Sequence, residues 1–322
     1  MFIKTIIIAY VLIWGTMKMA SSQDAVFSQF YANPLYLNPA FAGSEHCNRF
    51  ALNYRNQPFP EFGKIASYSV SADRYFDILS GGLGMSVMHD NQTGLITQTQ
   101  ANAFYAYHTQ LNRKWHVHFG LQAGYLHHGL ETSGLVFPDQ YHPDGSLGNS
   151  GESDLFGLQS HDVDFSSGML FYNNKFYLGA AVHHLMEPRT FISGSESLAL
   201  KYTFHAGYGM YMKTGRWKED VFFSPNLIVQ MQSGFLRINA GGHLNIEPLM
   251  FGVWYRQSFQ HPNTLIFQLG IKQVNYAIGY SYDYSLSGFS GNTSGAHELS
   301  VLLNLHCKRH KDKYRILNCP AF

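Results

Sequence analysis

The chain has 322 residues, of which 13% are charged and 16% are aromatic, and its formal net charge at pH 7 is +1. This balanced charge excludes a basic surface of the kind that binds nucleic acid. The slightly negative mean hydropathy excludes a bundle of membrane-spanning helices. Few charges, many aromatic residues and 30 glycines are instead typical of a large β protein whose outer surface does not face water.

Residues 1–22 predict a secretory signal peptide. Lys4 precedes an apolar run of nine residues, 6–14 (IIIAYVLIW), and small residues at 20–22 occupy the positions that a signal peptidase reads. The alternative, a transmembrane anchor, needs a longer apolar stretch. Cleavage after Ser22 would leave 20 basic against 21 acidic residues, a formal net charge of −1. No cysteine lies near this cleavage site, so we do not expect a lipoprotein.

Residues 23–48 form an aromatic-rich segment ahead of the first predicted strand, and we assign it to the periplasm or to the lumen of a barrel. Its two Asn-Pro steps stop helix and strand alike, which predicts a coil. One interpretation is a coil that only leads into the first strand. A second is a segment packed in the barrel mouth or lumen, because so many large apolar groups would not stay in water. A third is direct contact with a partner. The residues that we single out for mouth packing or partner contact are Phe30, Tyr31, Asn33, Pro34, Tyr36, Asn38 and Pro39.

Strict alternation of apolar and polar residues is the main signal in the rest of the chain. In residues 235–246 (FLRINAGGHLNI) every second residue is apolar or small, and the residues between them include Arg237, Asn239 and His243. Such a strand either turns its apolar side to a protein core and its polar side to water, or turns its apolar side to lipid and its polar side to a wet interior. The same period of two recurs in segments of about ten residues, the length that crosses a bilayer at a tilt of about 45°.

This alternation predicts about fourteen strands. Their approximate spans are 49–56, 65–73, 81–89, 97–108, 114–126, 163–172, 175–185, 200–212, 221–232, 235–246, 250–258, 264–272, 274–283 and 296–306.

The predicted connections alternate in length, as they do in outer-membrane barrels, which have short periplasmic turns and longer outer loops. Successive connections lie at alternate ends of the barrel. Short turns such as Asn173-Asn174 and Glu247-Pro248-Leu249 lie at the end that also carries both chain ends, and we expect this end in the periplasm. Ser233-Gly234 is an exception, a short turn on the outer side. The three longest connections all fall on the outer parity: 127–162, 186–199 and 284–295.

These observations predict an all-β fold, a transmembrane antiparallel up-and-down β-barrel of the outer-membrane type spanning 49–306. A soluble sandwich would place Lys and Glu on its polar face, whereas the polar parity here holds Asn, Gln, Ser, His and Gly with scattered single charges. Aromatic residues recur near strand ends, as in the girdles at the two membrane interfaces. We therefore favour the membrane barrel over a soluble β fold.

Residues 307–322 are a basic tail that we expect in the periplasm. Its basic residues, within 308–315, are either solvated or touch an acidic partner or lipid headgroups. Barrel closure would make Cys47, before the first strand, a neighbour of Cys307, after the last. A disulfide from Cys47 to Cys307 or to Cys319 is compatible with this geometry, and the sequence does not choose between them. The odd number of cysteines leaves at least one thiol over.

The 17 histidines raise a metal hypothesis. The adjacent pairs His127-His128 and His183-His184 do not support it, because neighbours on a strand point to opposite faces. No Cys-x-x-Cys or His-Glu-x-x-His spacing is present. Ser160-His161-Asp162 lies in a predicted loop, without a recognisable oxyanion site. We therefore predict no metal, no cofactor, no small-molecule substrate and no enzyme activity.

Long segments of the chain resemble a known family. They are QDAVFSQFYANPLYLNPAFAGS (23–44), NYRNQPFP (53–60), SYSVSAD (67–73), LNRKWHVHFGLQAGY (111–125), FYNNKFYLGAAVHHLMEP (171–188) and YSYDYSLSGFSGNTSGAHELSVLLN (280–304). They resemble the PorP/SprF family of type IX secretion and gliding-motility outer-membrane proteins, from about Gln23 to Leu305. The family often has Trp in the segment that matches 57–60, where this chain has Phe59.

The resemblance implies a non-catalytic barrel in the outer membrane of a Gram-negative bacterium, surrounded by outer-membrane lipid. It implies one of two roles, and the sequence does not choose between them. The barrel either partners a large secreted surface adhesin for export or attachment, or anchors the secretion apparatus through periplasmic type IX secretion subunits. If it holds an adhesin, we expect the outer loops 127–162 and 284–295 to contact it. The alternative function is a passive diffusion porin.

Overall fold

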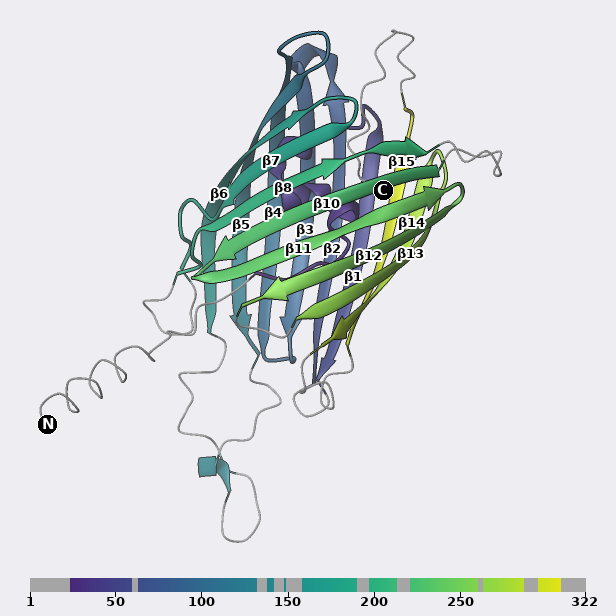
Figure 1. The fold of residues 1–322 in the computed structure, drawn as a ribbon. Helices are drawn as coiled ribbons and strands as arrows, with labels where there is room; N and C mark the ends of the chain where they lie inside the picture. The colour runs from purple at the N-terminus through teal and green to yellow at the C-terminus, as the bar shows by residue number, and fades with distance from the viewer. Residues whose placement is uncertain are drawn as a thin grey trace, which may run out of the picture.

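The computed structural model describes residues 24–59, 63–131, 138–141, 148, 158–189, 197–212, 221–259, 263–286 and 295–307. The predicted signal peptide, 1–22, and the basic tail beyond Cys307 lie outside these residues. Within them, a single antiparallel sheet closes on itself as a barrel of strongly tilted strands (Figure 1). No helix among the described residues is long and apolar enough to cross a membrane.

The strands follow one another around the ring in chain order. Their bounds are β1 (Asn48–Phe59), β2 (Gly63–Phe76), β3 (Gly81–Gln92), β4 (Ile96–Gln110), β5 (His116–Leu130), β6 (Gln159–Tyr172), β7 (Phe176–His183), β8 (Lys201–Tyr208), β9 (Met210–Met212), β10 (Val221–Gln232), β11 (Phe235–Ile246), β12 (Leu249–Ser258), β13 (Thr264–Lys272), β14 (Tyr276–Ser285) and β15 (Ala296–Leu305). The ring closes because β15 pairs with β1 from Asn48↔Leu305 to Asn56↔His297.

Fourteen strands form the barrel wall in the described part of the chain. β8 and β9 both pair with β10 and are separated by the single residue Gly209, so they form one interrupted crossing. The predicted fold class is confirmed, and three predicted spans, 221–232, 235–246 and 264–272, coincide with β10, β11 and β13. Strands β5 and β6 extend further toward the longest loop than predicted, to Leu130 and from Gln159. The triplet Ser160-His161-Asp162 consequently lies on β6 and not in a loop, which corrects that prediction.

The two ends of the barrel differ in their connections. One end, here called the short-turn end, carries the connections 77–80, 111–115, 173–175, 247–248 and 273–275. The other, the long-loop end, carries the long connections 131–158, 184–200 and 286–295 as well as the short ones 60–62, 93–95, 233–234 and 259–263. By the rule for outer-membrane barrels, the short-turn end faces the periplasm and the long-loop end faces the exterior.

The two faces of each strand differ in chemistry as the alternation predicts. In β12, Phe251 and Val253 are 41% and 55% exposed on the outer face, whereas Trp254 and Arg256 are buried on the inner face. An exposed belt of large apolar side chains of this kind would be unstable in water and is suited to hydrocarbon. The outer face therefore meets lipid.

The inner face meets protein, and in this respect the wet interior considered from the sequence is wrong. Polar side chains such as Asn239 and His243 are 0% and 1% exposed. What buries them is the N-terminal segment, here defined as residues 24–47, whose short helical turns lie between the near and far walls of the barrel (Figure 1). The polar parity of the strands is therefore a packing surface.

The lipid-facing assignment predicts a position-dependent cost of charge. We expect Phe267→Arg, at the middle of β13 on its exposed face, to lower the free energy of unfolding by about 2–4 kcal/mol, and Ile271→Arg, on the same face near the strand end, by about 0–1 kcal/mol. The measurement is reversible urea unfolding in lipid vesicles. Equal losses for the two variants would contradict a hydrocarbon belt centred on this strand.

Candidate functional site

The N-terminal segment runs through the lumen from one end of the barrel to the other. At the long-loop end, the Asp24 carboxylate lies 2.9 Å from the Lys201 ammonium at the start of β8. At the short-turn end, the Gly43 amide donates to the Asp73 carboxylate of β2 at 2.7 Å. Between these ends, the Asn33 amide donates to the Ser69 hydroxyl near the middle of β2. Residue 24 and Cys47 thus lie at opposite ends of the barrel, and the position of residue 24 at the exterior end corrects the prediction that both chain ends lie on the periplasmic side.

The central part of the segment forms helical turns, which corrects the prediction of a coil. They are η1 (Phe30–Ala32), α2 (Pro34–Leu37) and η2 (Pro39–Phe41). Pro34 and Pro39 each stand at the first position of a turn, where a missing N–H costs nothing and the fixed φ suits the helix. The Asn38 side chain accepts a hydrogen bond from the Ala40 amide and so caps η2. Each Asn-Pro step therefore begins a short helical turn.

A buried cluster of charges holds Ser28 toward the long-loop end. The Ser28 amide donates to Glu298 at 2.6 Å, and the Ser28 hydroxyl donates to Asp283 at 2.6 Å. The guanidinium groups of Arg55 and Arg256 donate to the same hydroxyl oxygen at 2.8 and 2.9 Å. Two cations and two carboxylates balance in this cluster, which is what makes burial of four charges tolerable.

A second charged group, here called the latch, holds the first described residue. The two nitrogens of His184 contact Asp164 at 2.8 Å and Asp24 at 2.9 Å, and Lys201 also donates to the Tyr36 hydroxyl. Burial raises the pKa of the Asp24 carboxyl, but the charges of His184 and Lys201 outweigh it and hold that pKa well below its ordinary value. Burial lowers the pKa of His184, but Asp24 and Asp164 raise it to about 9. At neutral pH the latch is therefore a carboxylate held between two cations.

The position of His184 corrects the prediction that the pair His183-His184 points to opposite faces. Strand β7 ends at His183, and His184 has a left-handed backbone with φ of 61°. Both side chains are consequently buried, at 6% and 3% exposure. The two nitrogens of His184 are both taken up by carboxylates, those of Asp24 and Asp164.

Backbone contacts dominate at the short-turn end. Arg49 donates to Asp73 at 2.7 Å and to the Phe41 carbonyl at 2.9 Å. His108 contacts the Ala42 carbonyl at 2.9 Å. The disulfide between Cys47 and Cys307 joins the end of the N-terminal segment to the end of β15, whereas Cys319 lies outside the described residues. The segment is therefore covalently fastened at one end and held by charge at the other.

Two wall glycines allow the segment to touch the barrel wall directly. A Cβ on Gly120 of β5 would overlap the Ala40 backbone nitrogen and lie 2.6 Å from the Ala40 Cα. A Cβ on Gly82 of β3 would overlap the Ala42 carbonyl oxygen and lie 2.6 Å from the Gly43 Cα. Only glycine fits this close approach of two backbones.

Aromatic packing fills the space between these polar contacts. Phe30 and Tyr31 lie against Trp254 of β12, with ring centroids 5.8 and 5.5 Å apart, and Tyr31 also meets His243 edge-on at 5.0 Å. All seven N-terminal residues singled out from the sequence line the lumen: Phe30, Tyr31, Asn33, Pro34, Tyr36, Asn38 and Pro39. The sequence analysis did not identify the strand residues that contact them. In the sequence, each of those residues is only one of many scattered charged or amide residues on the polar faces of the strands.

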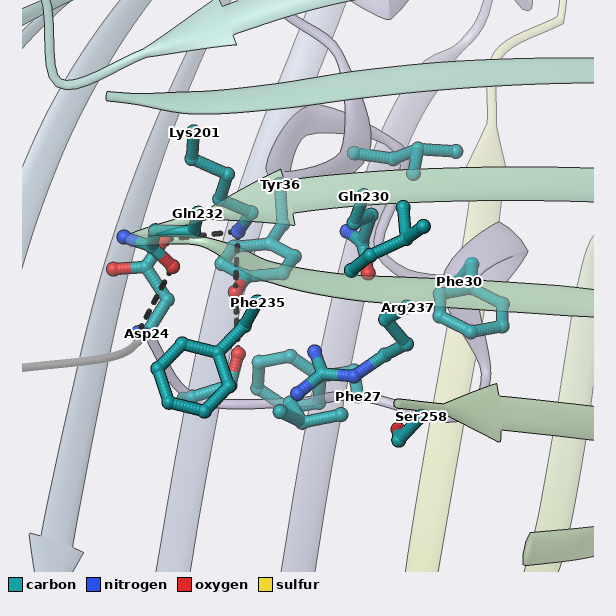
Figure 2. Close-up of a pocket in the computed structure, with 14 residues that line it drawn as sticks. Asp24, Phe27, Phe30, Tyr36, Lys201, Gln230, Gln232, Phe235, Arg237 and Ser258 are labelled. Carbon is teal, nitrogen blue, oxygen red and sulfur yellow. Dashed lines mark hydrogen bonds and ion pairs between the residues drawn. The ribbon is translucent and has the colours of Figure 1, made fainter. Parts of the chain in front are cut away.

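Two small cavities lie beside the N-terminal segment in the described lumen. A cavity of about 30 Å³ lies between the N-terminal segment and β10–β12 (Figure 2), and one of about 20 Å³ lies beside the latch. Each has room for about one or two water molecules. Among the described residues, no three His, Cys, Asp or Glu side chains gather so as to hold a metal ion.

Fold and site together define a class of protein, an outer-membrane-type β-barrel filled by its own N-terminal segment. The chain belongs to the family described as type IX secretion system membrane protein PorP/SprF, whose model matches residues 19–303. The family and the hydrocarbon-facing barrel surface place the protein in the outer membrane of a Gram-negative bacterium.

Solved barrels are similar only at low identity. The Acinetobacter baumannii outer membrane protein Omp33 shares 8% identity over 81% of this chain and 100% of its own, with a TM-score of 0.43. The CymD monoaromatic hydrocarbon channel shares 13% identity over 85% of this chain and 93% of its own, with a TM-score of 0.42. Similarity at this level carries no information on function. A comparison with curated proteins found no match.

The contact at Gly120 predicts a way to displace the N-terminal segment. We expect Gly120→Val to expel the segment, because its side chain would occupy the position of the Ala40 backbone. The measurement is chymotrypsin cleavage at the aromatic residues of 24–47 in detergent, from which the wild type should be protected. Ala123→Val, on the outer face of the same strand, should leave that protection intact. Equal cleavage of both variants would contradict the close packing.

The latch predicts a stability that is lost at alkaline pH. Because the pKa of folded His184 is about 9, above the ordinary value of 6.5, its contribution is complete below 6.5 and is lost as the pH rises through 9. The measurement is the unfolding midpoint of the wild type and of His184→Gln across this range. We expect the difference between them to shrink with rising pH, whereas His127→Gln, on β5 away from the latch, should track the wild type throughout. A constant difference would contradict a charged latch.

Proposed function

We propose that this protein is a sealed, non-catalytic scaffold of the type IX secretion system. In this role it partners a large secreted surface adhesin for export or attachment, as gliding motility requires, or it anchors the secretion apparatus by binding periplasmic subunits. The observation that carries the proposal is the filled lumen. A scaffold needs a rigid barrel with two presented ends and no transport path through it.

The contacts of the N-terminal segment support this role. It is held by Asp24 at one end, by Ser28 and Asn33 along its length and by a disulfide at the other end. The cavities beside it hold about one or two water molecules each. A barrel built in this way resists solute flow and keeps its shape when a large partner pulls on it.

The same observation disfavours a passive diffusion porin. A porin needs a continuous water-filled path lined by charged residues. Most of the lumenal arginines here are paired with carboxylates, as at Arg55 with Asp283 and Arg49 with Asp73. These paired charges hold the N-terminal segment in the lumen and are not free to select solutes.

The two ends would take different partners. The outer loops 127–162 and 284–295 are the proposed contact for an adhesin, and most of their residues lie outside the described part of the chain. The basic tail beyond Cys307 is the proposed contact for an acidic periplasmic partner or for lipid headgroups, and it too lies outside the described residues.

Conductance in planar lipid bilayers tests the sealed barrel. We expect the full mature chain to give no stepwise conductance, and a variant that lacks residues 24–42 to open a stable pore, because a fourteen-strand ring without its filling encloses water. This variant keeps Cys47 and thus the disulfide to Cys307. Steady stepwise conductance of the intact chain would overturn the scaffold in favour of the porin.

A purification from native outer membranes then separates the two scaffold roles. Co-purification of a very large secreted protein supports the adhesin role, and co-purification of periplasmic subunits supports the anchoring role. Recovery of the barrel without either partner, from cells that export their surface proteins normally when the barrel is deleted, would contradict both.

A further inference from the structure

The cavity between the N-terminal segment and β10–β12 contains an arginine that the rest of the lumen does not explain. Figure 2 shows Arg237 of β11 reaching between the Phe27 ring and Ser258, with no interaction marked from its guanidinium. Among the described residues, none of the ion pairs with a carboxylate involves this group. Arg237 is half-buried, and an arginine in such a place without a counter-ion is unfavourable.

The other inward-facing arginines on the described strands are paired. Arg49 lies 2.7 Å from Asp73, and Arg55 and Arg256 lie 2.9 and 3.1 Å from Asp283. Arg237 differs from them in position as well, because it stands two residues from the start of β11 at the long-loop end. The unpaired cation is therefore found where the lumen meets the exterior.

Two further donors line the same cavity. Gln230 of β10 and Ser258 of β12 are 8% and 9% exposed, and within the described part of the chain neither the Gln230 amide nor the Ser258 hydroxyl has a hydrogen-bond partner. Together with the guanidinium they offer a planar fork and two neutral donors. This set suits a carboxylate, which accepts bidentate hydrogen bonds from arginine.

The protein's own acid in this cavity is already committed. Asp24 also lines it, but its carboxylate is held by Lys201 and by His184, both at 2.9 Å. The remaining walls are aromatic and aliphatic, from Phe27, Phe30, Phe235 and Leu236 among others. Because the cavity has room for little more than a carboxylate, an apolar group of the ligand would lie at the mouth of the cavity against these side chains.

The size and access of the cavity point to a peptide. A volume of about 30 Å³ admits a group as small as a carboxylate and excludes a bulky phosphate diester. The strands beside it, β10 and β11, are joined by the two-residue turn Ser233-Gly234, whereas the connections 131–158, 184–200 and 286–295 at this end are long. The barrel wall therefore extends only a short way beyond the cavity on this side, so an extended peptide can reach the cavity from the exterior.

We infer that Arg237, Gln230 and Ser258 form a carboxylate-binding site that receives an acidic side chain or the C-terminal carboxylate of a partner peptide with an adjacent aromatic residue. This site deepens the proposed scaffold function and rests on it, because the partner that it would hold is a protein at the outer end of the barrel. The two carboxylate sources share one chemistry, and they can be told apart with synthetic peptides.

The test measures how fast methylglyoxal, a small arginine reagent, modifies individual arginines of the full mature chain in detergent micelles, read by peptide mapping. We expect Arg237 to react faster than the paired Arg55 and Arg256. A peptide of alternating Phe and Glu with an amidated C-terminus should protect Arg237 by about tenfold, as one charge-assisted contact can. The matched peptide of alternating Phe and Gln with an amidated C-terminus should not protect Arg237. If the same Phe and Gln peptide with a free C-terminus does protect it, the site binds C-terminal carboxylates.

Fluorescence anisotropy with the same labelled peptides gives a second readout. Arg237→Gln should weaken binding of the acidic peptide about tenfold. Arg189→Gln removes an exposed charge at the same end of the barrel and should leave binding unchanged. These results need no secreted partner, so their failure would leave the conductance test of the sealed scaffold untouched.

Three outcomes would overturn the inference. Arg237 that resists methylglyoxal without any peptide would show that another part of this chain already covers it. Equal protection by the amidated acidic and neutral peptides would show that charge plays no part. Full protection by sodium acetate at the peptide concentration would assign the site to free small carboxylates and remove the peptide from the proposal.

Discussion

The polar inner face of the barrel is the constraint on which the rest of this structure depends. A closed ring turns one face of every strand to lipid, so its polar side chains can be satisfied only inside the lumen. In a barrel of this kind, either water or protein must meet them. Here protein does so, because residues 24–47 lie along the lumen and bring hydroxyl, amide and carbonyl groups to the strands, as Ser28 does to Asp283 and Glu298. The N-terminal segment is thus part of the core of the protein.

Charge balance inside the lumen follows from the same constraint. Buried arginines are stable only when carboxylates lie beside them, and Arg55 and Arg256 share the carboxylate of Asp283. The latch repeats this arrangement, since the Asp24 carboxylate also lies between two cations. The one inward arginine without a carboxylate among the described residues, Arg237, lies at the open end. A site for an outside ligand at that position is compatible with a sealed lumen.

Local periodicity accounts for what could be predicted. The alternation in 235–246 is strict, and it set both the bounds of β11 and the face that each side chain takes. The prediction was wrong where a chain end or a strand end changed the geometry. Pro34 and Pro39 begin helical turns, because proline at a first helical position loses no hydrogen bond. His184 turns inward because its backbone leaves the strand with a positive φ.

The sequence by itself determined the number of strands, which face of each strand meets lipid and which end carries the long loops, because these depend on neighbours two to ten positions apart. It also placed an aromatic segment ahead of the first strand. Only the tertiary structure decided the path of that segment, the pairing of Cys47 with Cys307 and the partners of the buried charges. Ser28 and Glu298 are 270 positions apart, and nothing local to either residue indicates that ring closure places them in contact.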